Sequence, residues 1–387
     1  MKKQIVLFGA GALGKKAVNY YKQDRIVTFL DNNPDKWGKS LCGIGIMEPA
    51  KYARIQRDER VVICSYHVTE IMEQLRKLKI EEPYEVFYPP FSSYYPRNIL
   101  VYDPYKNRKQ AENECDLTEF IKERGIDGYI NSYARYLWEH LSCFSHVEIE
   151  TYNRCNGGCE FCPVSVRNES RPETKMKKEV FEKIISELAE MNYMGRLALF
   201  SNNEPFLDDR IIELHKYARE RLPKARMHLY TNGTLLSLDL FKKIIKYLDE
   251  LIIDNYAQNL ELISTNRAIR DYCNKNPELV EKVTIVLRKP KELLTSRGGS
   301  APNRVKIKKY SYASCALPFK QMIIRPDGKV SLCCNDPLGK STMGDVLQYS
   351  LIDIWNGEIF TETRKKLLEG RGNLAYCKNC DTFQLTV

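Results

Sequence analysis

The sequence predicts an α/β protein with an N-terminal doubly wound domain, a partial barrel of about six strand–helix units and a small α+β C-terminal domain. Three patterns lead to this expectation. A Gly-rich turn lies between a strand pattern and a helix pattern near the N-terminus, and strand and helix patterns alternate regularly from residue 145. Further along, two alternating apolar runs flank Asp327-Gly328, which is typical of a β-hairpin.

The composition is that of a globular protein with more than one domain. The chain has 387 residues, against about 150 for a typical domain, and 43% of them are hydrophobic. No apolar run approaches the roughly 20 residues of a membrane helix, and the apolar run after the basic start is too short for a signal peptide. We therefore expect a cytoplasmic protein without membrane association.

Cysteine content and charge narrow the chemistry. The chain has 13 cysteines and no secretory signal, which indicates a reducing compartment, where clustered thiols bind metals more often than they form disulfides. The net charge of +10 favours an anionic small-molecule partner and does not require nucleic acid.

Residues 1–90 are expected to form a Rossmann-like domain. A strand over residues 4–8 leads through a Gly-rich turn into a helix, and a second strand follows over residues 26–30. A strand over residues 60–64 and a helix over residues 69–78 complete the unit.

The turn after the first strand has a G-x-G-x-x-G pattern made by Gly9, Gly11 and Gly14. Small residues there let a phosphate approach the helix N-terminus, and Asp31 follows about 20 residues later, where it can accept a ribose hydroxyl. We predict a nucleotide or nucleotide-sugar site, with a scaffold that binds nothing as the alternative. The run 31–43 makes the domain similar to the N-terminal domain of nucleotide-sugar acyltransferases.

Residues 91–144 are expected to connect this domain to the barrel. Tyrosines and prolines interrupt any regular pattern there, and residues 116–124 have helical spacing.

The barrel is predicted over residues 145–305. Its strands are expected at residues 146–150, 196–200, 226–230, 250–254 and 282–287. Helices between them include one over residues 209–222, capped by Asp208, and one that begins after Ser237. In such barrels the chemistry lies on the loops that follow the strands.

Three cysteines follow the first barrel strand: Cys155, Cys159 and Cys162. Their spacing lets a short loop present three sulfurs to a [4Fe-4S] cube and leaves one iron without a protein ligand. A structural zinc site needs four ligands, usually in pairs with two residues between the cysteines, so this trio argues against zinc. The alternative is a short metal knuckle or three unrelated cysteines.

The cysteine spacing, with Phe161 before the last cysteine, resembles the radical S-adenosylmethionine (SAM) superfamily. The resemblance implies that SAM binds the free iron through its amino and carboxylate groups. Cleavage of SAM would then give a 5'-deoxyadenosyl radical, which removes hydrogen from the substrate.

Further residues take their expected roles from this resemblance. Asn203, Glu204 and Pro205 follow the second barrel strand, where the family has a turn that holds the SAM amino group. Thr231 and Asp254 end later strands, at the level where family members contact the SAM ribose or carboxylate.

Residues 306–387 contain a second set of cysteines. The hairpin at Asp327-Gly328 and a helix over residues 351–368 would bring four of them together. Spacing alone also allows zinc. Their place after a radical SAM-like core instead resembles the Twitch relative of SPASM domains, which implies one auxiliary [4Fe-4S] cluster and two clusters in all. The four expected ligands are Cys315, Cys333, Cys377 and Cys380.

Cys334 stands beside an expected ligand. Adjacent side chains in a strand point to opposite faces, so we expect Cys333 alone to bind the cluster. Cys334 is then an alternative ligand, a catalytic thiol that returns hydrogen to the substrate, or a bystander.

Residues 288–309 contain eight basic side chains against one acid. Arginine can hold a phosphate through two hydrogen bonds, and we expect Arg297 to bind the substrate. A solvated linker is the alternative.

The leading expectation is a radical SAM oxidoreductase that removes hydrogen from a C–H bond of an anionic sugar or glycan-pathway intermediate, with dehydrogenation or epimerisation as the outcome. It would need an external one-electron reductant such as flavodoxin or ferredoxin. One alternative is a maturase of a ribosomal peptide, although the N-terminal domain lacks the usual leader-binding pattern. The other is a zinc-stabilised nucleotide-binding regulator.

Overall fold

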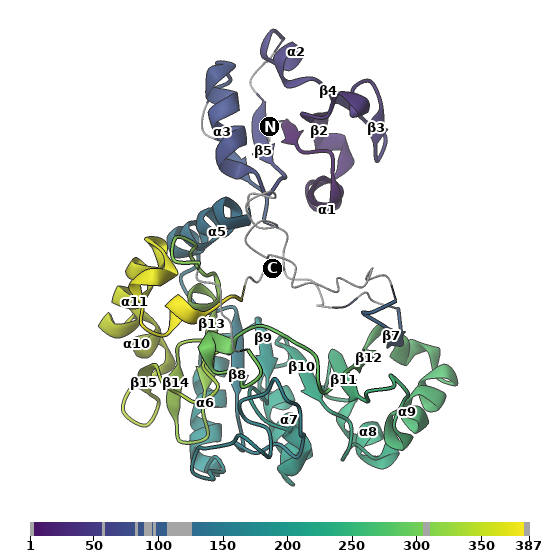
Figure 1. Cartoon of the computed structure of the whole chain (residues 1–387), viewed down its shortest axis with the longest axis vertical. Coiled ribbons are helices and arrows are strands. Elements are labelled where there is room, and N and C mark those ends of the chain that lie inside the picture. The colour runs from purple at the N-terminus through teal and green to yellow at the C-terminus, as the bar shows by residue number, and fades with distance from the viewer. Residues whose placement is uncertain are drawn as a thin grey trace. The chain divides into compact units, whose positions relative to one another are not determined.

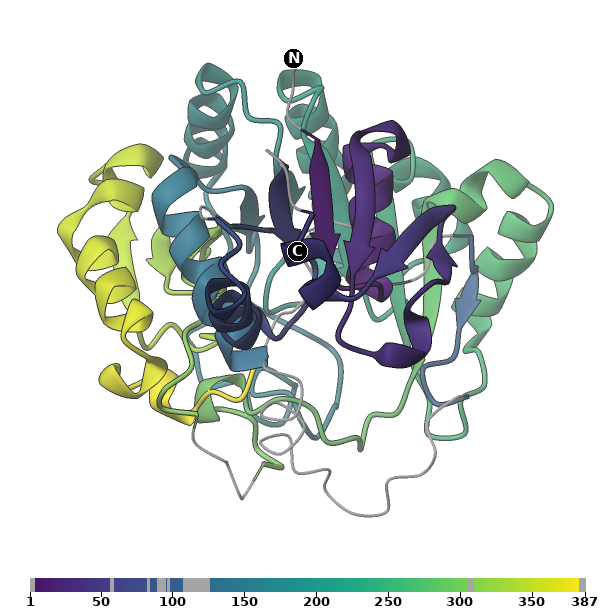
Figure 2. The same cartoon turned by 90° about the horizontal axis from the view of Figure 1, so that it is seen from above.

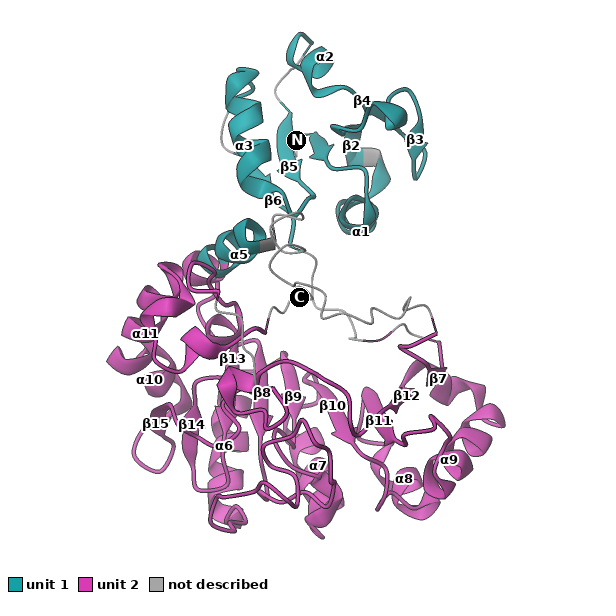
Figure 3. Ribbon diagram, viewed as in Figure 1, with its two compact units in different colours: residues 1–94, 115–136, 384–387 teal, residues 95–114, 137–383 magenta. Residues whose placement is uncertain are grey.

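A computed structural model describes residues 4–55, 59–81, 84–88, 95, 98–106, 126–304 and 310–382. The chain divides into two compact units, drawn in teal and magenta in Figure 3. Unit 1 comprises residues 1–94, 115–136 and 384–387, and unit 2 comprises residues 95–114 and 137–383. The helix expected over residues 116–124 lies outside the described residues.

Unit 1 contains a six-stranded sheet in the order β3-β4-β2-β1-β5-β6. Its neighbouring strands are parallel except for the β3–β4 hairpin. With the first strand in the middle and a crossover to either side, this is the strand order of a Rossmann-like domain, as the sequence predicts. The strands are β1 Ile5–Phe8, β2 Ile26–Leu30, β3 Ser40–Leu41, β4 Ile44–Met47, β5 Arg60–Ile63 and β6 Glu85–Val86, and the helices are α1 Ala12–Tyr21, α2 Pro49–Ala53 and α3 Val68–Lys77.

Unit 2 contains a nine-stranded sheet in the order β15-β14-β13-β8-β9-β10-β11-β12-β7. Every neighbouring pair from β13 to β7 is parallel, as expected for a partial barrel, and Figures 1 and 2 show the helices of this unit on the outer side of its curved sheet. The strands are β7 Val101–Tyr102, β8 His146–Ile149, β9 Arg196–Ala198, β10 Arg226–Thr231, β11 Glu250–Tyr256, β12 Val283–Arg288, β13 Gln321–Ile324, β14 Lys329–Ser331 and β15 Thr342–Asp345.

The helices of unit 2 follow its strands. Helix α5, Ile126–His140, spans the division between the units. The others are α6 Lys178–Glu190, α7 Ile211–Arg221, α8 Leu238–Ile244, α9 Ser264–Asn274, α10 Leu351–Asn356 and α11 Glu358–Leu368. None of the helices in the described part of the chain is long and apolar enough to cross a membrane.

Two pairings in unit 2 were not expected from the sequence. Strand β7 adds a parallel strand next to β12 from a segment that shows no strand pattern. Strand β13 pairs in parallel with β8, so the C-terminal hairpin continues the barrel sheet. A two-residue strand is too short for periodicity to reveal, and which strands become neighbours depends on contacts across the fold.

Two helices differ from the prediction, one by a break within it and one at its start. Gly357 is extended (φ −64°, ψ 159°) and divides the helix expected over residues 351–368 into α10 and α11. Helix α7 begins after Arg210, because the Asp208 carboxylate accepts the Arg210 backbone and side-chain N–H groups before the helix starts. Ser237 caps α8 as predicted, with its hydroxyl accepting from Leu240 N at 3.2 Å.

One face of the barrel sheet is polar although it is buried. Arg196 of β9 forms an ion pair of 3.1 Å with Glu250 of β11, and the rings of His146 and His228 lie 5.2 Å apart. The residues that alternate with His146 and Glu148 in β8 are fully buried valine and isoleucine. The polar face therefore carries charged and titratable side chains up to the strand ends, where the loops begin.

Candidate active site

A cavity of about 230 Å³ lies at the ends of strands β8 to β11. Its wall includes the three cysteines of the first loop, the turn after β9 and polar residues at the ends of β10 and β11. The lining residues are Cys155, Gly157, Cys159, Phe161, Cys162, Val164, Phe200, Ser201, Asn202, Asn203, Glu204, Tyr230, Thr231, Asn232, Asp254, Tyr256 and Arg297.

Two of the three sulfurs, those of Cys155 and Cys159, lie beside Gly157. A side chain at Gly157 would lie 3.3 Å from the sulfur of Cys155 and 3.9 Å from that of Cys159, so glycine keeps the space beside both thiols open. No three His, Cys, Asp or Glu side chains in the described ranges are placed to hold a single metal ion. Burial raises the pKa of Cys155 and of Cys159 to about 12, so metal binding there must displace protons.

Glu204 anchors the turn after β9. Its Oε1 accepts hydrogen bonds from Thr231 Oγ1 at 2.7 Å and from Phe206 N at 3.2 Å, and its Oε2 accepts from Asn232 N at 2.8 Å. Pro205 begins the short 3-10 turn that follows. Burial raises the pKa of Glu204 to about 7, although these hydrogen bonds oppose the rise. Glu204 therefore joins two strand ends and keeps one acceptor position open.

Three side-chain polar atoms of the cavity wall are buried without a partner in the described structure. They are two donors, the Nδ2 of Asn203 and the Nε of Arg297, and one acceptor, the Oδ1 of Asp254. Burial raises the pKa of Asp254 to about 6, against the attraction of Arg288. Because an unsatisfied buried polar group costs about 1–3 kcal/mol, open donors and an open acceptor beside one cavity indicate a site for a polar ligand.

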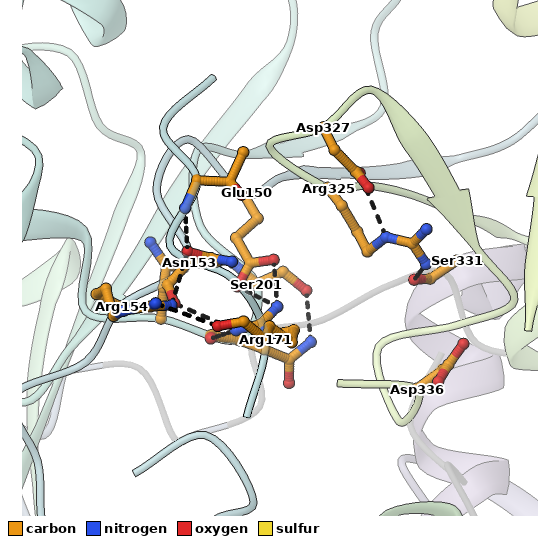
Figure 4. A network of polar contacts seen from close by, with 12 residues as sticks. Glu150, Asn153, Arg154, Arg171, Ser201, Arg325, Asp327, Ser331 and Asp336 are labelled. Carbon is orange, nitrogen blue, oxygen red and sulfur yellow. Dashed lines mark hydrogen bonds and ion pairs between the residues drawn. The ribbon is translucent and has the colours of Figure 1, made fainter. Parts of the chain in front are cut away.

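Arg171 ties the cysteine loop to the turn after β9 (Figure 4). Its guanidinium contacts Glu150 Oε2 at 2.9 Å and Glu169 Oε2 at 2.8 Å, and it donates to the Asn202 carbonyl at 3.2 Å. Burial raises the pKa of Glu150 to about 7, and Arg171 opposes that rise. The network holds both loops of the cavity in one arrangement.

A second, smaller cavity of about 10 Å³ is lined by the other four cysteines of interest, Cys315, Cys333, Cys377 and Cys380. Arg371 also lines it, and its guanidinium donates to the carbonyls of Ser314 at 2.7 Å and Cys380 at 2.8 Å. Cys334 is not among the described lining residues of either cavity. The structure thus turns Cys333 toward the other three cysteines.

Arg297 reaches the first cavity from a loop fastened to the C-terminal cysteine segment. Its carbonyl accepts from Tyr376 Oη at 3.1 Å, and its guanidinium donates to the Asn202 side chain and, at 3.4 Å, to the Cys334 carbonyl. Gly298 is left-handed (φ 63°), and a Cβ there would lie 2.3 Å from the Tyr376 ring. This loop connects the two cysteine sites.

Three of the described basic residues of the segment 288–309 are paired with acids. Arg288 pairs with Glu292 at 2.8 Å, Arg304 pairs with Asp381, and Lys291 lies 3.8 Å from Glu160. Its lysines at 306, 308 and 309 lie outside the described residues.

Comparison with known proteins agrees with this geometry. Residues 149–299 match a family model described as the radical SAM superfamily, and residues 315–381 match one described as an iron-sulfur cluster-binding domain of SPASM type. The S-adenosyl-L-methionine-dependent 2-deoxy-scyllo-inosamine dehydrogenase of Niallia circulans is 30% identical over 244 residues, which cover 62% of this chain and 94% of the relative. The chain belongs to the radical SAM superfamily.

A solved structure supports the fold of this radical SAM enzyme. The crystal structure of BtrN in complex with AdoMet and 2-DOIA is 26% identical and has a TM-score of 0.55. The match covers 63% of this chain and 95% of that one. The zinc-regulator alternative is therefore set aside, and the chain is an iron-sulfur enzyme that uses SAM, [4Fe-4S] chemistry and an electron from a reductant.

The cavity of this radical SAM enzyme fits its cofactors. SAM carries an ammonium, a carboxylate and ribose hydroxyls, and the open atoms of Asn203 and Asp254 are a donor and an acceptor for such groups. Three thiols on the same wall, beside the space left by Gly157, suit a cluster with one open iron.

The glycine pattern of unit 1 has a different environment. Asp31 Oδ2 accepts from Ala10 N at 2.8 Å and from Lys36 Nζ at 2.9 Å, and its Oδ1 accepts from Asn33 N at 2.9 Å. The carboxylate that we expected to hold a ribose is engaged by the protein itself, which favours the scaffold alternative. Residues 1–86 match a family model described as C2185-like, N-terminal.

The sequence prediction missed several residues in and around the first cavity. Arg171 and Tyr256 belong to no motif, Ser201 stands in the predicted turn before Asn203 without an assigned role, and Glu148 was predicted only as part of a strand. Tyr256 lies 5.9 Å from Phe161, ring centre to ring centre. One signal was present: His146, Glu148 and Glu150 alternate with Val147 and Ile149. Such alternation in a strand with helices on its apolar side indicates a polar barrel interior.

Proposed function

We propose that this enzyme is a radical SAM dehydrogenase that oxidises a secondary alcohol of an aminocyclitol or amino sugar to a ketone. The name of the Niallia circulans relative, a 2-deoxy-scyllo-inosamine dehydrogenase, supports this substrate class. The proposal narrows the expected glycan-pathway intermediate to an amino-substituted polyol.

The first cavity would hold the radical-generating cofactors. Cys155, Cys159 and Cys162 would bind one [4Fe-4S] cluster, and SAM would complete its open iron. When bound, this pair supplies the 5'-deoxyadenosyl radical that removes a hydrogen atom from a substrate C–H bond. The residues that would position SAM are Phe161, Asn203, Glu204, Pro205, Thr231 and Asp254.

One observation carries the choice of dehydrogenation: the four-cysteine cavity is joined to the SAM cavity by the Arg297 loop. Loss of a hydrogen atom leaves a substrate radical that must still lose an electron and a proton to become a ketone. An auxiliary [4Fe-4S] cluster on Cys315, Cys333, Cys377 and Cys380 would accept that electron. The enzyme would then contain two clusters and draw its reducing electron from a flavodoxin or ferredoxin.

We assign Arg297 to the substrate. Its guanidinium lines the cavity beside Asn202 and Cys334, within reach of a hydroxyl or an acidic group of a bound molecule. Since the described neighbours Arg288 and Arg304 are paired with acids, the cavity presents less positive charge than the sequence indicates. This smaller positive charge at the cavity suits a substrate without a phosphate group.

The test is anaerobic incubation of reconstituted enzyme with SAM, a reductant and substrate. The expected result with 2-deoxy-scyllo-inosamine or a related aminocyclitol is 5'-deoxyadenosine and a ketone in equal amounts, with deuterium carried from the substrate carbon into 5'-deoxyadenosine. An epimer without net oxidation would replace this proposal by epimerisation, for which Cys334 is the candidate hydrogen donor. Absence of 5'-deoxyadenosine with aminocyclitols and amino sugars would contradict the substrate class, and its formation with phosphorylated sugars would replace that class.

A further inference from the structure

Glu148 is a buried carboxylate that neither the cluster site nor the SAM site uses. It lies in β8 on the polar face of the barrel sheet and is 7% exposed. Its Oε2 accepts a hydrogen bond of 2.6 Å from Ser201 Oγ. Ser201 lines the first cavity together with Phe200, Tyr230 and Arg297, whereas Glu148 is not among the described lining residues. The Ser201 hydroxyl therefore connects the cavity to a buried acid.

The surroundings of Glu148 suit a group that takes up a proton. His146 Nε2 lies 3.5 Å from Glu148 Oε1, and burial, reinforced by Arg196 and Lys320, holds the pKa of His146 well below its usual value, so that it is neutral. Burial raises the pKa of Glu148 to about 7, although the Ser201 hydrogen bond, Arg297 and Arg196 oppose the rise. The Cys334 thiol interacts with it from the C-terminal segment. A carboxylate with a pKa near neutrality can both accept and release a proton.

We propose that Ser201 and Glu148 form the proton exit of the reaction, in which Ser201 accepts the hydroxyl proton of the substrate alcohol and passes its own proton to Glu148. The inference rests on the proposed dehydrogenation. Oxidation of the alcohol removes one hydrogen atom, one proton and one electron. The 5'-deoxyadenosyl radical would take the hydrogen atom of the C–H bond, and an auxiliary [4Fe-4S] cluster held by Cys315, Cys333, Cys377 and Cys380 would take the electron. The O–H bond breaks as the C=O bond forms, and its proton goes to the Ser201–Glu148 pair.

In this scheme Ser201 touches the substrate and Glu148 acts through it. Glu148→Gln keeps the size of the side chain and can still accept the Ser201 hydrogen bond, but it cannot take up a proton. Ser201→Ala removes the connecting hydroxyl. Glu250→Gln is the matched control, because Glu250 is buried in the same sheet, pairs with Arg196 and is not among the described cavity-lining residues.

The test compares ketone with 5'-deoxyadenosine in the reconstituted holoenzyme. For Glu148→Gln and Ser201→Ala we expect ketone formation to fall by about 100-fold while 5'-deoxyadenosine formation changes by less than about threefold. Substrate affinity measured with SAM but without reductant should change by less than about threefold for Glu148→Gln. Infrared difference spectra over a pH titration should show a protonated carboxylic acid in the wild type that is missing from Glu148→Gln. The Glu250→Gln control should keep the wild-type ratio of the two products.

The outcomes separate this inference from the proposed function. A wild type that cleaves SAM but oxidises no aminocyclitol contradicts the function. An active wild type whose Glu148→Gln variant keeps the normal ratio of ketone to 5'-deoxyadenosine overturns the proton exit alone. If Glu148→Gln fails to retain its iron, Ser201→Ala decides in the same assay, and a normal ratio there also overturns the inference.

Discussion

The glycine turn of unit 1 and the cysteine loop of unit 2 occupy similar positions in their sheets but differ in their surroundings. The glycine turn follows β1 and the cysteine loop follows β8, and each has a partner carboxylate after a later strand, Asp31 in one and Glu204 in the other. Both patterns predict a ligand. Their surroundings in the structure separate them.

In unit 1 the acidic side chain and the glycines of the pattern are engaged by other groups of the protein. Both carboxylate oxygens of Asp31 accept hydrogen bonds from the protein, and a side chain at Gly14 would lie 2.3 Å from the Gly9 carbonyl oxygen. In unit 2 the pattern lines a cavity and leaves polar atoms of Asn203 and Asp254 open. A motif whose polar groups are all hydrogen-bonded within the protein therefore indicates a structural role, whereas a motif that leaves buried polar atoms unpaired beside a cavity indicates a binding site.

The largest expected effect separates the two cysteine sites. Cys159→Ala should abolish SAM cleavage. It should also lower the iron content from about eight to about four per chain, because two thiolates cannot hold the [4Fe-4S] cluster. Cys377→Ala should also lose iron but should still form 5'-deoxyadenosine without ketone. Anaerobic iron analysis and 5'-deoxyadenosine assays check both variants. Cys273→Ala, at a buried position in α9, is the control and should keep its iron; SAM cleavage by Cys159→Ala would refute the site.

The next effect compares two aspartates. Asp254→Asn should weaken SAM binding by about 10- to 100-fold, measured by equilibrium dialysis without reductant, because the open buried acceptor loses its charge. Asp31→Asn should leave SAM binding unchanged and destabilise unit 1 by about 1–3 kcal/mol, measured by urea unfolding. Equilibrium binding measurements with NAD and UDP-sugars should detect no binding to the wild type. Binding that Asp31→Asn abolishes would make the glycine turn a ligand site after all.

The buried acid Glu148 should make stability depend on pH. Its pKa in the folded protein is about 7 against an ordinary value of 4.5, so it stabilises the fold below about pH 4.5, and this contribution is lost as pH rises through 7. Glu148→Gln stays neutral and loses nothing. Between pH 4.5 and 8 the stability difference should therefore shift toward the variant by up to about 3 kcal/mol. Urea unfolding across this range checks it; a difference independent of pH would contradict the prediction.

The smallest effects test the glycines. Gly14→Ala should cost about 1–3 kcal/mol, because its Cβ would lie 2.3 Å from Gly9 O and 2.9 Å from Phe29. Gly11→Ala should change stability by less than about 0.5 kcal/mol, since its φ of −125° is extended and no atom lies within 4 Å of the added carbon. Thermal unfolding measures both. A larger loss for Gly11→Ala than for Gly14→Ala would reverse the packing interpretation.

Most of the fold could be predicted from local sequence patterns. The barrel strands, the Rossmann-like unit and the Asp327-Gly328 hairpin follow from residues close together in the chain, because periodicity and turn chemistry are local. The parallel strand β7 and the junction of β13 with β8 could not be read this way, since their neighbours lie far away in sequence.

The sequence by itself determined the kind of chemistry, because the spacing of Cys155, Cys159 and Cys162 is a local property that predicts an iron-sulfur loop. Only the tertiary structure decided what surrounds that loop. In the folded protein Asp31 is hydrogen-bonded, and four cysteines far apart in the chain line one small cavity. Arg171 contacts two loops, and Ser201 lies between the cavity and Glu148. The physical reason is that whether a polar atom is satisfied or open depends on every element packed around it, and no stretch of sequence contains that information.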